Sequence, residues 1–500
     1  MKSKSLSAPN KLPIEGLTII FFKALYKWGR ALWPFILIYI FKSSKYQAYQ
    51  EYILLGVGVI LILSIIHAIL FYKHFSFQIK DNEFIVKRGY LNKEYKSIPL
   101  ERIQTVNIKQ NFIQQIIGVV QLDIDTAGSK EKEISLPALR LAHAKEIESF
   151  LLSQKENTDE DTAEKSDSIN KEASHKEEKK TLFKLSIPEL AKIAISDNIL
   201  KGGLLALSFT YGLYEQYNDI ITERFAKEID TMKETADSAS WQLILFAIGI
   251  FIVFSIVISV IRIILINFDL KLSKTSQGYK LEKGLFNKKS VIIPLSKIQT
   301  YTWTTNPIRK LFNIVTVTIK QASSNAVDEK NAVHIPGCKN SIEENIRKEI
   351  FNNSDYQDYS TYRTQAFYFI RSWFFLVLLP SALIPFFTGL KPILIGILAW
   401  DLLITYMLYK ASLKRQFSIS KDYIIAQKGA ISTTWKLVPL YKIQAVSFKQ
   451  SIFMKRKDRA SLRIYTASES FIIPYINTNT AMECYNFILY KIESKNRKWM

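Results

Sequence analysis

The residues of this chain that could do chemistry are few, and none forms a recognisable catalytic set. The sequence contains no Gly-x-Ser-x-Gly nucleophile elbow, no phosphate-binding glycine loop and no His-Glu-x-x-His zinc motif. Asp123 and Asp125 are paired acids on one face of an expected strand, because residues i and i+2 of a strand point the same way. The corresponding positions of the repeats described below carry other residue types, which argues against a catalytic pair. We therefore expect no catalytic residues and predict that the chain is not an enzyme.

Metals and cofactors have no evident set of ligands. Cys338 and Cys484 are the two cysteines, too few for a disulfide framework or a four-ligand zinc site. The five histidines form no pair at metal-binding spacing. We expect no metal, no cofactor, and reduced thiols that face the cytosol.

Asp401 is an ionisable residue near the middle of an apolar stretch, residues 393–409. A charge at that depth in a membrane is costly and suggests a function. One hypothesis makes Asp401 the essential group of a transport pathway. The other is structural: pairing with Arg371 or another base of the helix bundle, or a tilted helix that brings Asp401 near water. A single aspartate falls short of a proton or substrate pathway.

The charge and the apolar runs indicate a membrane protein. The 500 residues carry 67 Lys and Arg against 45 Asp and Glu, a net charge of +22, which suits an anionic membrane surface or a nucleic acid. Apolar runs near the length needed to cross a bilayer come in pairs. We predict six transmembrane helices in three hairpins, at residues 28–41, 52–72, 199–214, 241–266, 373–388 and 393–409.

The flanking charges predict the orientation of these spans. Bases dominate before the first span, whereas residues 215–240 carry seven acids and three bases. By the positive-inside rule, loop 215–240 is external and both termini are cytoplasmic. We expect a multi-pass protein of the plasma membrane, with most of its polar mass on the cytoplasmic side.

A sequence module recurs three times. Each copy has a glycine, a proline ten residues later, then a base and a glutamine in Pro-Leu-x-Arg/Lys-Ile-Gln. A residue that tolerates left-handed backbone follows fourteen positions after the glutamine, at Gly118, Asn313 and Asp458. The motif residues are Gly89, Pro99, Arg102 and Gln104; Gly284, Pro294, Lys297 and Gln299; and Gly429, Pro439, Lys442 and Gln444.

Each module reads as five to seven short strands followed by one helix, directly after a helical hairpin. The glycines are expected to adopt positive φ between strands. Residues 154–181 are polar and charged and are predicted to be a disordered linker. The predicted segments are 1–74 (N-terminal segment and hairpin 1), 75–153 (domain 1), 154–181 (linker), 182–266 (hairpin 2 with external loop 215–240), 267–352 (domain 2), 353–414 (hairpin 3) and 415–500 (domain 3).

These motifs resemble the bacterial pleckstrin-homology (PH) domain membrane proteins of the YdbS/YdbT type, and the triplication resembles the longer, YdbT-like members. The resemblance covers the chain outside the linker and the external loop. It implies an α+β membrane protein in which each hairpin is followed by a cytoplasmic PH-like small β-barrel closed by a C-terminal helix. It carries over no catalytic residue.

The third module departs from the other two. Ile116-Ile117 and Leu311-Phe312 precede the left-handed position in the first two modules, whereas the third has Arg456-Lys457 within Lys455, Arg456, Lys457 and Arg459. Either an apolar contact has been lost, or a charged surface has formed. The cluster is a candidate contact for anionic headgroups or an acidic partner, and a solvated loop is the plainer alternative. We expect no nucleic-acid partner, because no recognition helix or stacking motif is present.

The motif bases Arg102, Lys297 and Lys442 suit either carbonyl capping within the domain or contact with a headgroup, and the motif glutamines suit bonds to backbone. The leading hypothesis is a non-enzymatic, membrane-held binding or scaffold unit. Its three domains would bind another membrane or cytoplasmic protein, lipid headgroups or each other. The alternative is a six-helix transporter or lipid-handling protein that uses Asp401.

Overall fold

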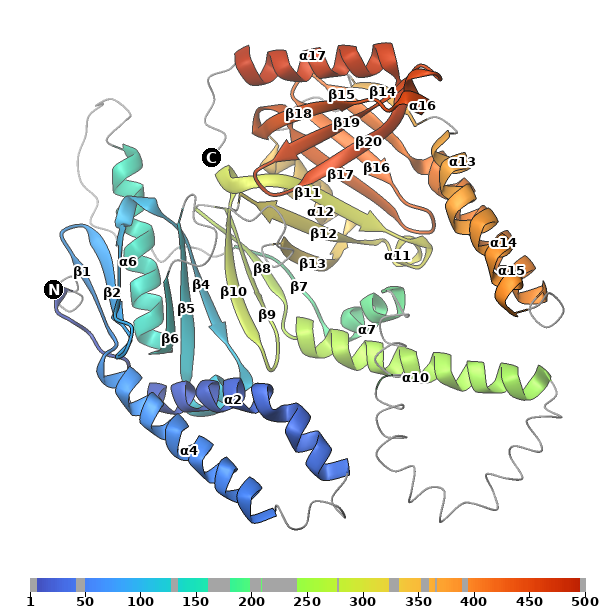
Figure 1. Ribbon diagram of the computed structural model, residues 1–500. Coiled ribbons are helices and arrows are strands. Elements are labelled where there is room, and N and C mark those ends of the chain that lie inside the picture. Colours follow the sequence, from blue (N-terminus) through green and yellow to red (C-terminus); the bar gives the residue numbers. More distant parts are fainter. Residues whose placement is uncertain are drawn as a thin grey trace, which may run out of the picture. The chain divides into compact units, whose positions relative to one another are not determined.

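The structure is a computed structural model (Figure 1). It describes residues 7–41, 50–126, 134–160, 180–197, 208, 241–276, 278–322, 332–351, 359–364, 367–388 and 394–494. The chain divides into two compact units, Met1–Ser276 with Lys280–Ile292 and Gln277–Tyr279 with Ile293–Met500. Each unit is described by itself below.

The first module begins with two helices and a three-stranded sheet. Helices α2 (Glu15–Phe41) and α4 (Gln50–Lys73) precede strands β1 (Ser76–Lys80), β2 (Glu83–Arg88) and β3 (Glu94–Pro99), which pair antiparallel in the order β1-β2-β3. A 3-10 turn, η2 (Leu100–Arg102), leads into β4 (Ile103–Gln110), α5 (Phe112–Ile117), β5 (Val119–Thr126), β6 (Ile134–Arg140) and α6 (Leu141–Glu160).

The core of this module lies between its two groups of strands and is closed by α6. Phe77 and Phe84 of the first sheet, Leu122 of β5 and Ile147 of α6 are at most 1% exposed and belong to one apolar cluster. The alternation of apolar and polar residues along the strands produces this one-sided burial. The expected small β-domain with a closing helix is therefore present.

The second group of strands of the first module does not end at the module boundary. It continues into the second module as a seven-stranded sheet in the order β6-β5-β4-β10-β9-β8-β7. The added strands are β7 (Lys180–Lys184), β8 (Lys271–Thr275), β9 (Gly278–Lys283) and β10 (Lys288–Pro294). Strand β4 thus pairs with a strand from the next module.

The second unit repeats this arrangement. A seven-stranded sheet runs in the order β13-β12-β11-β17-β16-β15-β14, and a three-stranded sheet β18-β19-β20 completes the third module. The strands are β11 (Ile298–Thr305), β12 (Ile314–Gln321), β13 (Ala332–Lys339), β14 (Tyr359–Arg363), β15 (Gln416–Ser420), β16 (Tyr423–Lys428), β17 (Thr433–Pro439), β18 (Ile443–Lys449), β19 (Arg459–Thr466) and β20 (Ser470–Asn477). Helices α12 (Asn340–Ile350) and α17 (Thr478–Ser494) follow β13 and β20, as α6 follows β6.

A strand on each side of the predicted second and third hairpins belongs to the same sheet. β7 pairs with β8 around the second hairpin, and β14 pairs with β15 around the third. In the first module, a bridge between Asn10 and Phe77 occupies the equivalent place. Residues 182–184 and 359–363, which the sequence places in the hairpin segments, are therefore strand residues.

Two of the six predicted spans are long and apolar enough to cross a membrane in the described part of the chain. They are Leu55–Lys73 within α4 and Gly249–Asn267 within α10 (Trp241–Asn267). Residues 199–214 lie outside the described residues apart from Ser208. The other predicted spans fall in α2, in α13 (Phe367–Trp373) with the π-helix η5 (Phe374–Leu378) and α14 (Leu379–Thr388), and in α15 (Leu394–Lys414). Six transmembrane helices are therefore not established.

The first part of the predicted linker is helical. Helix α6 continues to Glu160, so residues 154–160 are helical. Residues 161–179 of the linker and most of the external loop lie outside the described residues. A further helix, α7 (Ile187–Ser196), is opened by a capping box between Ser186 and Glu189.

Candidate functional site

The short helix α16 (Ile452–Lys455) presents an apolar and basic surface at one end of the third domain. Ser451 caps the helix by accepting the Met454 backbone N–H at 3.3 Å, and the Met454 side chain is buried. This anchor turns Ile452 and Phe453 outward, where they are 73% and 71% exposed. We call Ile452, Phe453, Lys455, Arg456 and Lys457 the α16 tip.

The bases of the α16 tip are exposed, as a candidate contact surface requires. Lys455, Arg456 and Lys457 are exposed, whereas Arg459 is half-buried as the first residue of β19. Asp458 takes φ 52°, the left-handed conformation predicted for it, and its carboxylate accepts a hydrogen bond from Asn477. The bases are evident from the sequence, whereas the two exposed apolar residues before the buried Met454 are evident only from the structure.

The α16 tip lies at the end of the domain to which the third hairpin is attached. The register of β19 and β20 sets Arg459 opposite Asn477, and Tyr475 lies two residues before Asn477. Arg371 of α13 donates to the Tyr475 hydroxyl at 2.5 Å. Tyr368 of α13 accepts a hydrogen bond from Arg415, whose guanidinium carbon is 4.1 Å from the Tyr368 ring centroid. The hairpin and the end of the domain are therefore held together.

The equivalent tips of the first two modules are more apolar. The first has no base, and the second has one exposed base, Lys310, at the position of Lys455. Ile116 of α5 is 71% exposed, and Leu311 of α11 (Pro307–Leu311) is 81% exposed. Ile117 packs partly against Ile19 of α2, whereas its counterpart in the third module is the exposed Lys457. The third module has thus both lost an apolar contact and gained a charged surface.

The repeated motif residues hold the same backbone in all three modules. Gly89, Gly284 and Gly429 have φ of 91°, 108° and 135°, and a Cβ at each would collide with the backbone carbonyl three residues ahead. The prediction of positive φ is confirmed. Pro99, Pro294 and Pro439 end β3, β10 and β17, and each leads into a 3-10 turn: η2, η3 (Leu295–Lys297) or η6 (Leu440–Lys442).

The motif bases are not equally placed. Arg102 is exposed, whereas Lys297 and Lys442 are 6% and 2% exposed. The Lys442 ammonium donates to the backbone carbonyl of Ser296, and burial lowers the pKa of Lys442. Carbonyl capping therefore describes Lys442, and burial removes Lys297 and Lys442 from reach of a headgroup. Gln299 is fully buried and Gln444 is exposed; the side chain of Gln104 is not described.

The two acids of the first module have structural partners. Asp123 is fully buried, and its carboxylate accepts from Lys109 at 2.7 Å, Gln121 at 2.6 Å and Ser135 at 2.8 Å. Asp125 accepts from Asn107 at 3.1 Å. These contacts satisfy both carboxylates within the sheet.

Asp401 contacts a hydroxyl and not a base among the interactions described for it. The Ser381 hydroxyl of α14 donates to the Asp401 carboxylate at 2.7 Å. Arg371, the partner that the sequence suggested, instead donates to Tyr475. Nearby, Pro380 lacks the N–H that would bond to the carbonyl of Leu376, and the Trp400 indole donates to that carbonyl at 3.2 Å. Polar contacts therefore tie α15 to the segment η5–α14.

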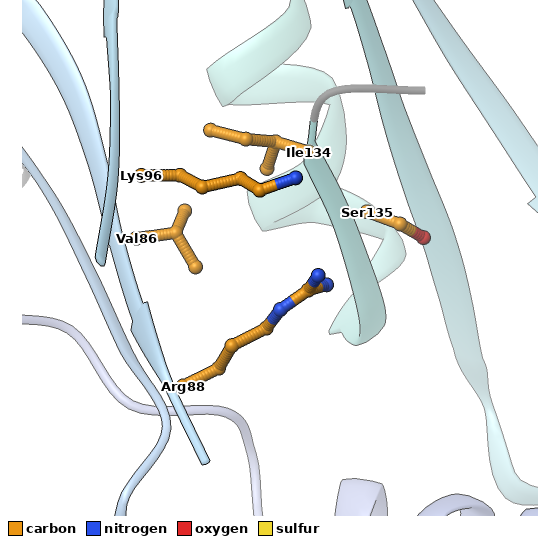
Figure 2. Close-up of a pocket in the computed structure, with 5 residues that line it drawn as sticks. All are labelled: Val86, Arg88, Lys96, Ile134 and Ser135. Atoms are coloured by element: carbon orange, nitrogen blue, oxygen red, sulfur yellow. The ribbon is translucent and has the colours of Figure 1, made fainter. Parts of the chain in front are cut away.

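A small cavity lies between the two groups of strands of the first module (Figure 2). Val86, Arg88 and Lys96 line it from β2 and β3, and Ile134 and Ser135 line it from β6. Its volume of about 10 Å³ is the space of one water molecule. Arg88 and Lys96 both pair with Glu94, at 2.6 and 3.2 Å, and hold the pKa of that carboxyl below its usual value. The cavity is too small for a headgroup.

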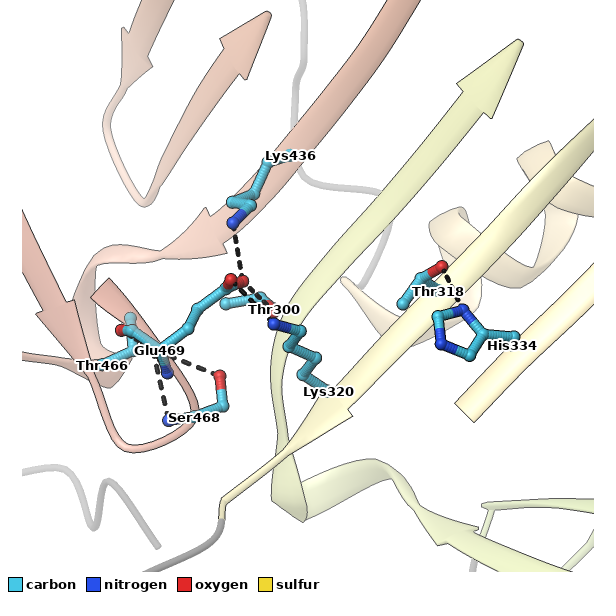
Figure 3. A network of polar contacts seen from close by, with 8 residues as sticks. All are labelled: Thr300, Thr318, Lys320, His334, Lys436, Thr466, Ser468 and Glu469. Carbon is cyan, nitrogen blue, oxygen red and sulfur yellow. Dashed lines mark hydrogen bonds and ion pairs between the residues drawn. The ribbon is translucent and has the colours of Figure 1, made fainter. Parts of the chain in front are cut away.

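Glu469 forms the centre of a polar network in the second unit (Figure 3). Its carboxylate pairs with Lys436 of β17 at 2.7 Å and with Lys320 of β12 at 2.9 Å, and accepts from Thr300 of β11 at 3.0 Å. Burial alone would raise the pKa of Glu469, but the two ammonium groups outweigh burial and lower it. The network ties the loop between β19 and β20 to the seven-stranded sheet. No motif in the sequence marks Glu469, since its partners lie far from it along the chain.

Comparison with known proteins agrees with this architecture. The bacterial PH domain family matches the sequence three times, at residues 35–155, 225–353 and 374–492. The chain therefore belongs to the bacterial PH domain family. It is also 26% identical over 461 residues to the UPF0699 transmembrane protein YdbT of Bacillus subtilis (strain 168), an alignment that covers 87% of each chain. Among the described residues, no group of three or more His, Cys, Asp or Glu is arranged to hold a metal ion.

Proposed function

We propose that this chain is a non-enzymatic integral membrane protein that acts as a membrane-held binding unit, with its α16 tip in contact with the headgroups of anionic lipids. Three PH-like domains would lie on the cytoplasmic face of the plasma membrane. The observation that carries the proposal is the exposed ring of Phe453 beside three exposed bases, at the end of the domain that holds the third hairpin.

The strand pairs around the hairpins support this placement. A polar sheet stays outside the hydrocarbon, so a segment that leaves a sheet and returns to the same sheet crosses the membrane an even number of times. The pairing of β7 with β8 and of β14 with β15 imposes this condition on residues 185–270 and 364–415. Both ends of each hairpin would therefore lie on one side of the membrane, where the domains are.

The chemistry of the α16 tip suits an anionic interface. Transfer of an aromatic ring such as Phe453 from water into the acyl boundary lowers the free energy, and nearby bases add electrostatic attraction to anionic lipid. Each base near an anionic leaflet contributes about 1 kcal/mol. Lys455, Arg456 and Lys457 together would give about 3 kcal/mol, which screening by salt reduces.

The experiment places the full-length protein in nanodiscs and reports on the α16 tip directly. An environment-sensitive dye is attached at Phe453→Cys, because Cys338 and Cys484 are buried and burial raises the pKa of their thiols to about 12 and about 11. Nanodiscs of phosphatidylcholine alone are compared with nanodiscs containing phosphatidylglycerol. We expect a blue shift that grows with the anionic lipid fraction and falls at high salt.

The matched control separates local charge from total charge. Arg456→Gln with Lys457→Gln, which leaves Lys455, should remove most of the dependence on anionic lipid, whereas Lys421→Gln with Lys428→Gln, two exposed bases elsewhere on the same domain, should preserve it. If the dye emission of the protein with all three bases does not change with the anionic lipid fraction, headgroup binding is refuted. A cross-linked pull-down from its own cells would then look for a protein partner of the same surface.

The alternative of a six-helix transporter or lipid-handling protein rests on Asp401. Its bond from Ser381 joins two helices, which suits a structural role. Under this alternative, Asp401→Asn would abolish function while leaving assembly intact.

A further inference from the structure

The two places where neighbouring modules join have the same strand register. Strand β4 pairs with β10 through Ile108 and Ser290, Lys109 and Lys289, and Gln110 and Lys288. Strand β11 pairs with β17 through Trp303 and Trp435, Thr304 and Thr434, and Thr305 and Thr433. Aligned on the motif glutamines and prolines, which are offset by 195 and 145 residues, these three pairs are equivalent. The joint between modules is therefore a repeated, specific interface.

Among the described strands, the first and third modules each carry one half of this joint without its partner half. Among the described strands, β3 pairs only with β2, and β18 pairs only with β19. β3 is the counterpart of β10 and β17, and β18 is the counterpart of β4 and β11. The motif glutamine reflects the difference, since Gln299 on β11 is fully buried and Gln444 on β18 is exposed.

The residues at the two open edges complement each other in the register of the internal joints. That register sets Lys449 of β18 opposite Glu94 of β3, which are opposite charges, and Phe448 opposite Tyr95, which are two aromatic rings. Phe448 and Tyr95 take the places of Trp303 and Trp435, whose rings are stacked. Tyr95 is 61% exposed.

A second contact of the joint also has its counterparts at the open edges. In the first joint, Phe112 of α5 packs edge-on against Phe286 in the turn between β9 and β10, with ring centroids 5.3 Å apart. The equivalent positions are Ile452 of the α16 tip and Leu91 in the turn between β2 and β3. Both are apolar, and they are 73% and 88% exposed.

We propose that β18 of one chain pairs antiparallel with β3 of a second copy of the same chain, so that the protein associates head to tail through a third joint of the internal kind. Such a contact uses different surfaces on the two copies and generates rings or linear arrays. Charged residues on an open edge usually prevent pairing between strands. Here Glu94 and Lys449 have opposite signs, which favours pairing between β3 and β18 over pairing of either strand with itself.

Disulfide trapping in membranes tests the pairing at one position. Chains with Glu94→Cys and chains with Lys449→Cys carry different tags and are expressed together. Residues directly opposite in an antiparallel pair have Cα atoms about 4.5–5.5 Å apart, within disulfide range. We expect a disulfide-linked dimer that contains both tags. Chains with Gln444→Cys provide the off-register control, because five residues along a strand is about 16 Å, too far to cross-link with position 94.

The possible products decide the proposal. A mixed-tag dimer from positions 94 and 449, with little product from 94 and 444, supports it. Equal yields at both positions, or dimers of one tag alone, would show that the cross-links come from random collisions between chains and would overturn the proposal. A single chain with both Glu94→Cys and Lys449→Cys that closes on itself at monomer mass also overturns it.

Charge reversal separates recognition from a change of fold. Glu94→Lys or Lys449→Glu alone should lower the associated fraction of full-length protein, measured by mass photometry in nanodiscs, by roughly threefold. The two reversals in the same chain should restore it. Glu94 also pairs with Arg88 and Lys96, so restoration by a change on β18 is the result that a purely local defect of β3 does not give. Failure of the double reversal to restore association would count against the joint.

Discussion

Trp303 and Trp435 stack face to face across the pair of strands β11 and β17, with ring centroids 5.7 Å apart and planes 9° apart. They come from different sequence modules, and the Arg347 guanidinium lies 5.0 Å from the Trp303 ring centroid. The stack occupies a position where the two modules share one sheet, so a domain boundary drawn from the repeat alone would cut through it.

Replacing Trp435 by alanine should weaken the second joint. The change removes the stack and a half-buried indole, and we expect the second unit to lose about 2 kcal/mol of stability. Trp435→Phe keeps a ring at this position and should retain most of the stability. Thermal unfolding of the full-length protein in nanodiscs measures both, and equal melting temperatures for alanine and tryptophan would show that the stack contributes little.

Acid should loosen the network around Glu469. Because the pKa of Glu469 in the folded protein lies below its unfolded value of about 4.5, its ion pairs stabilise the fold above that pH and lose their effect as the pH falls through the folded-state pKa. Glu469→Gln should cost about 3 kcal/mol near neutral pH, since Lys320 and Lys436 lose their counter-charge, and should flatten this part of the acid response.

The control for that prediction is the exposed acid Glu483 of α17. Glu483→Gln should leave both the stability near neutral pH and the acid response unchanged. Unfolding monitored by tryptophan fluorescence between about pH 3 and pH 7 gives the comparison. The assignment fails if Glu469→Gln and the unaltered protein lose stability in parallel over that range.

Gly429→Ala should lower the stability of the fold, in contrast to the same substitution of a glycine in a helix. Gly429 has φ 135°, and an added Cβ would collide with the Ser432 carbonyl, so we expect a loss of about 2–3 kcal/mol. Gly396 in α15 has open space where an added Cβ would stand, and Gly396→Ala should be neutral or slightly stabilising. Melting temperatures of the two variants check the difference.

Asp401→Asn discriminates between the structural and transport hypotheses. Asparagine keeps an oxygen that can accept the Ser381 hydrogen bond, so the proposed binding unit should assemble and complement a deletion strain as the unaltered protein does. Loss of complementation with normal assembly would favour the transporter. Ser381→Ala, which removes the donor and leaves the carboxylate, is the companion variant.

Reporter fusions test the expected orientation. A reporter after Lys233 should read as external, and one after Met500 as cytoplasmic, because residues 215–240 are acidic and the proposed arrangement puts both ends of each hairpin on the cytoplasmic side. Matching signals at the two sites would contradict the six-span arrangement.

Local requirements were the part of the structure that sequence could predict. The three motif glycines, together with Gly118, Asn313 and Asp458, all adopt positive φ as expected, because the residue type and its place between strands define the backbone there. The number of strands per module and the closing helix followed from alternation and repeat length.

Long-range pairing could not be predicted in the same way. Nothing in the residues around Lys109 indicates that β4 pairs with β10 of the next module, because an alternating pattern defines which face of a strand is buried but not which strand pairs with it. The ion pairs of Glu469 likewise join residues far apart in sequence. The α16 tip was only half recognised, since its bases stood out and Ile452 and Phe453 became visible only when burial was known.

Because neighbouring modules share a sheet, each sheet can be completed only at a late stage of synthesis. Strand β10 begins at Lys288, 288 − 110 = 178 residues after β4 ends at Gln110. At ribosomal speed the β4 edge therefore waits about 10–35 seconds for its partner, while the whole second hairpin is made. A chain cut after the first module would keep that edge open permanently. The nascent protein thus finishes each sheet only after the following hairpin has left the ribosome.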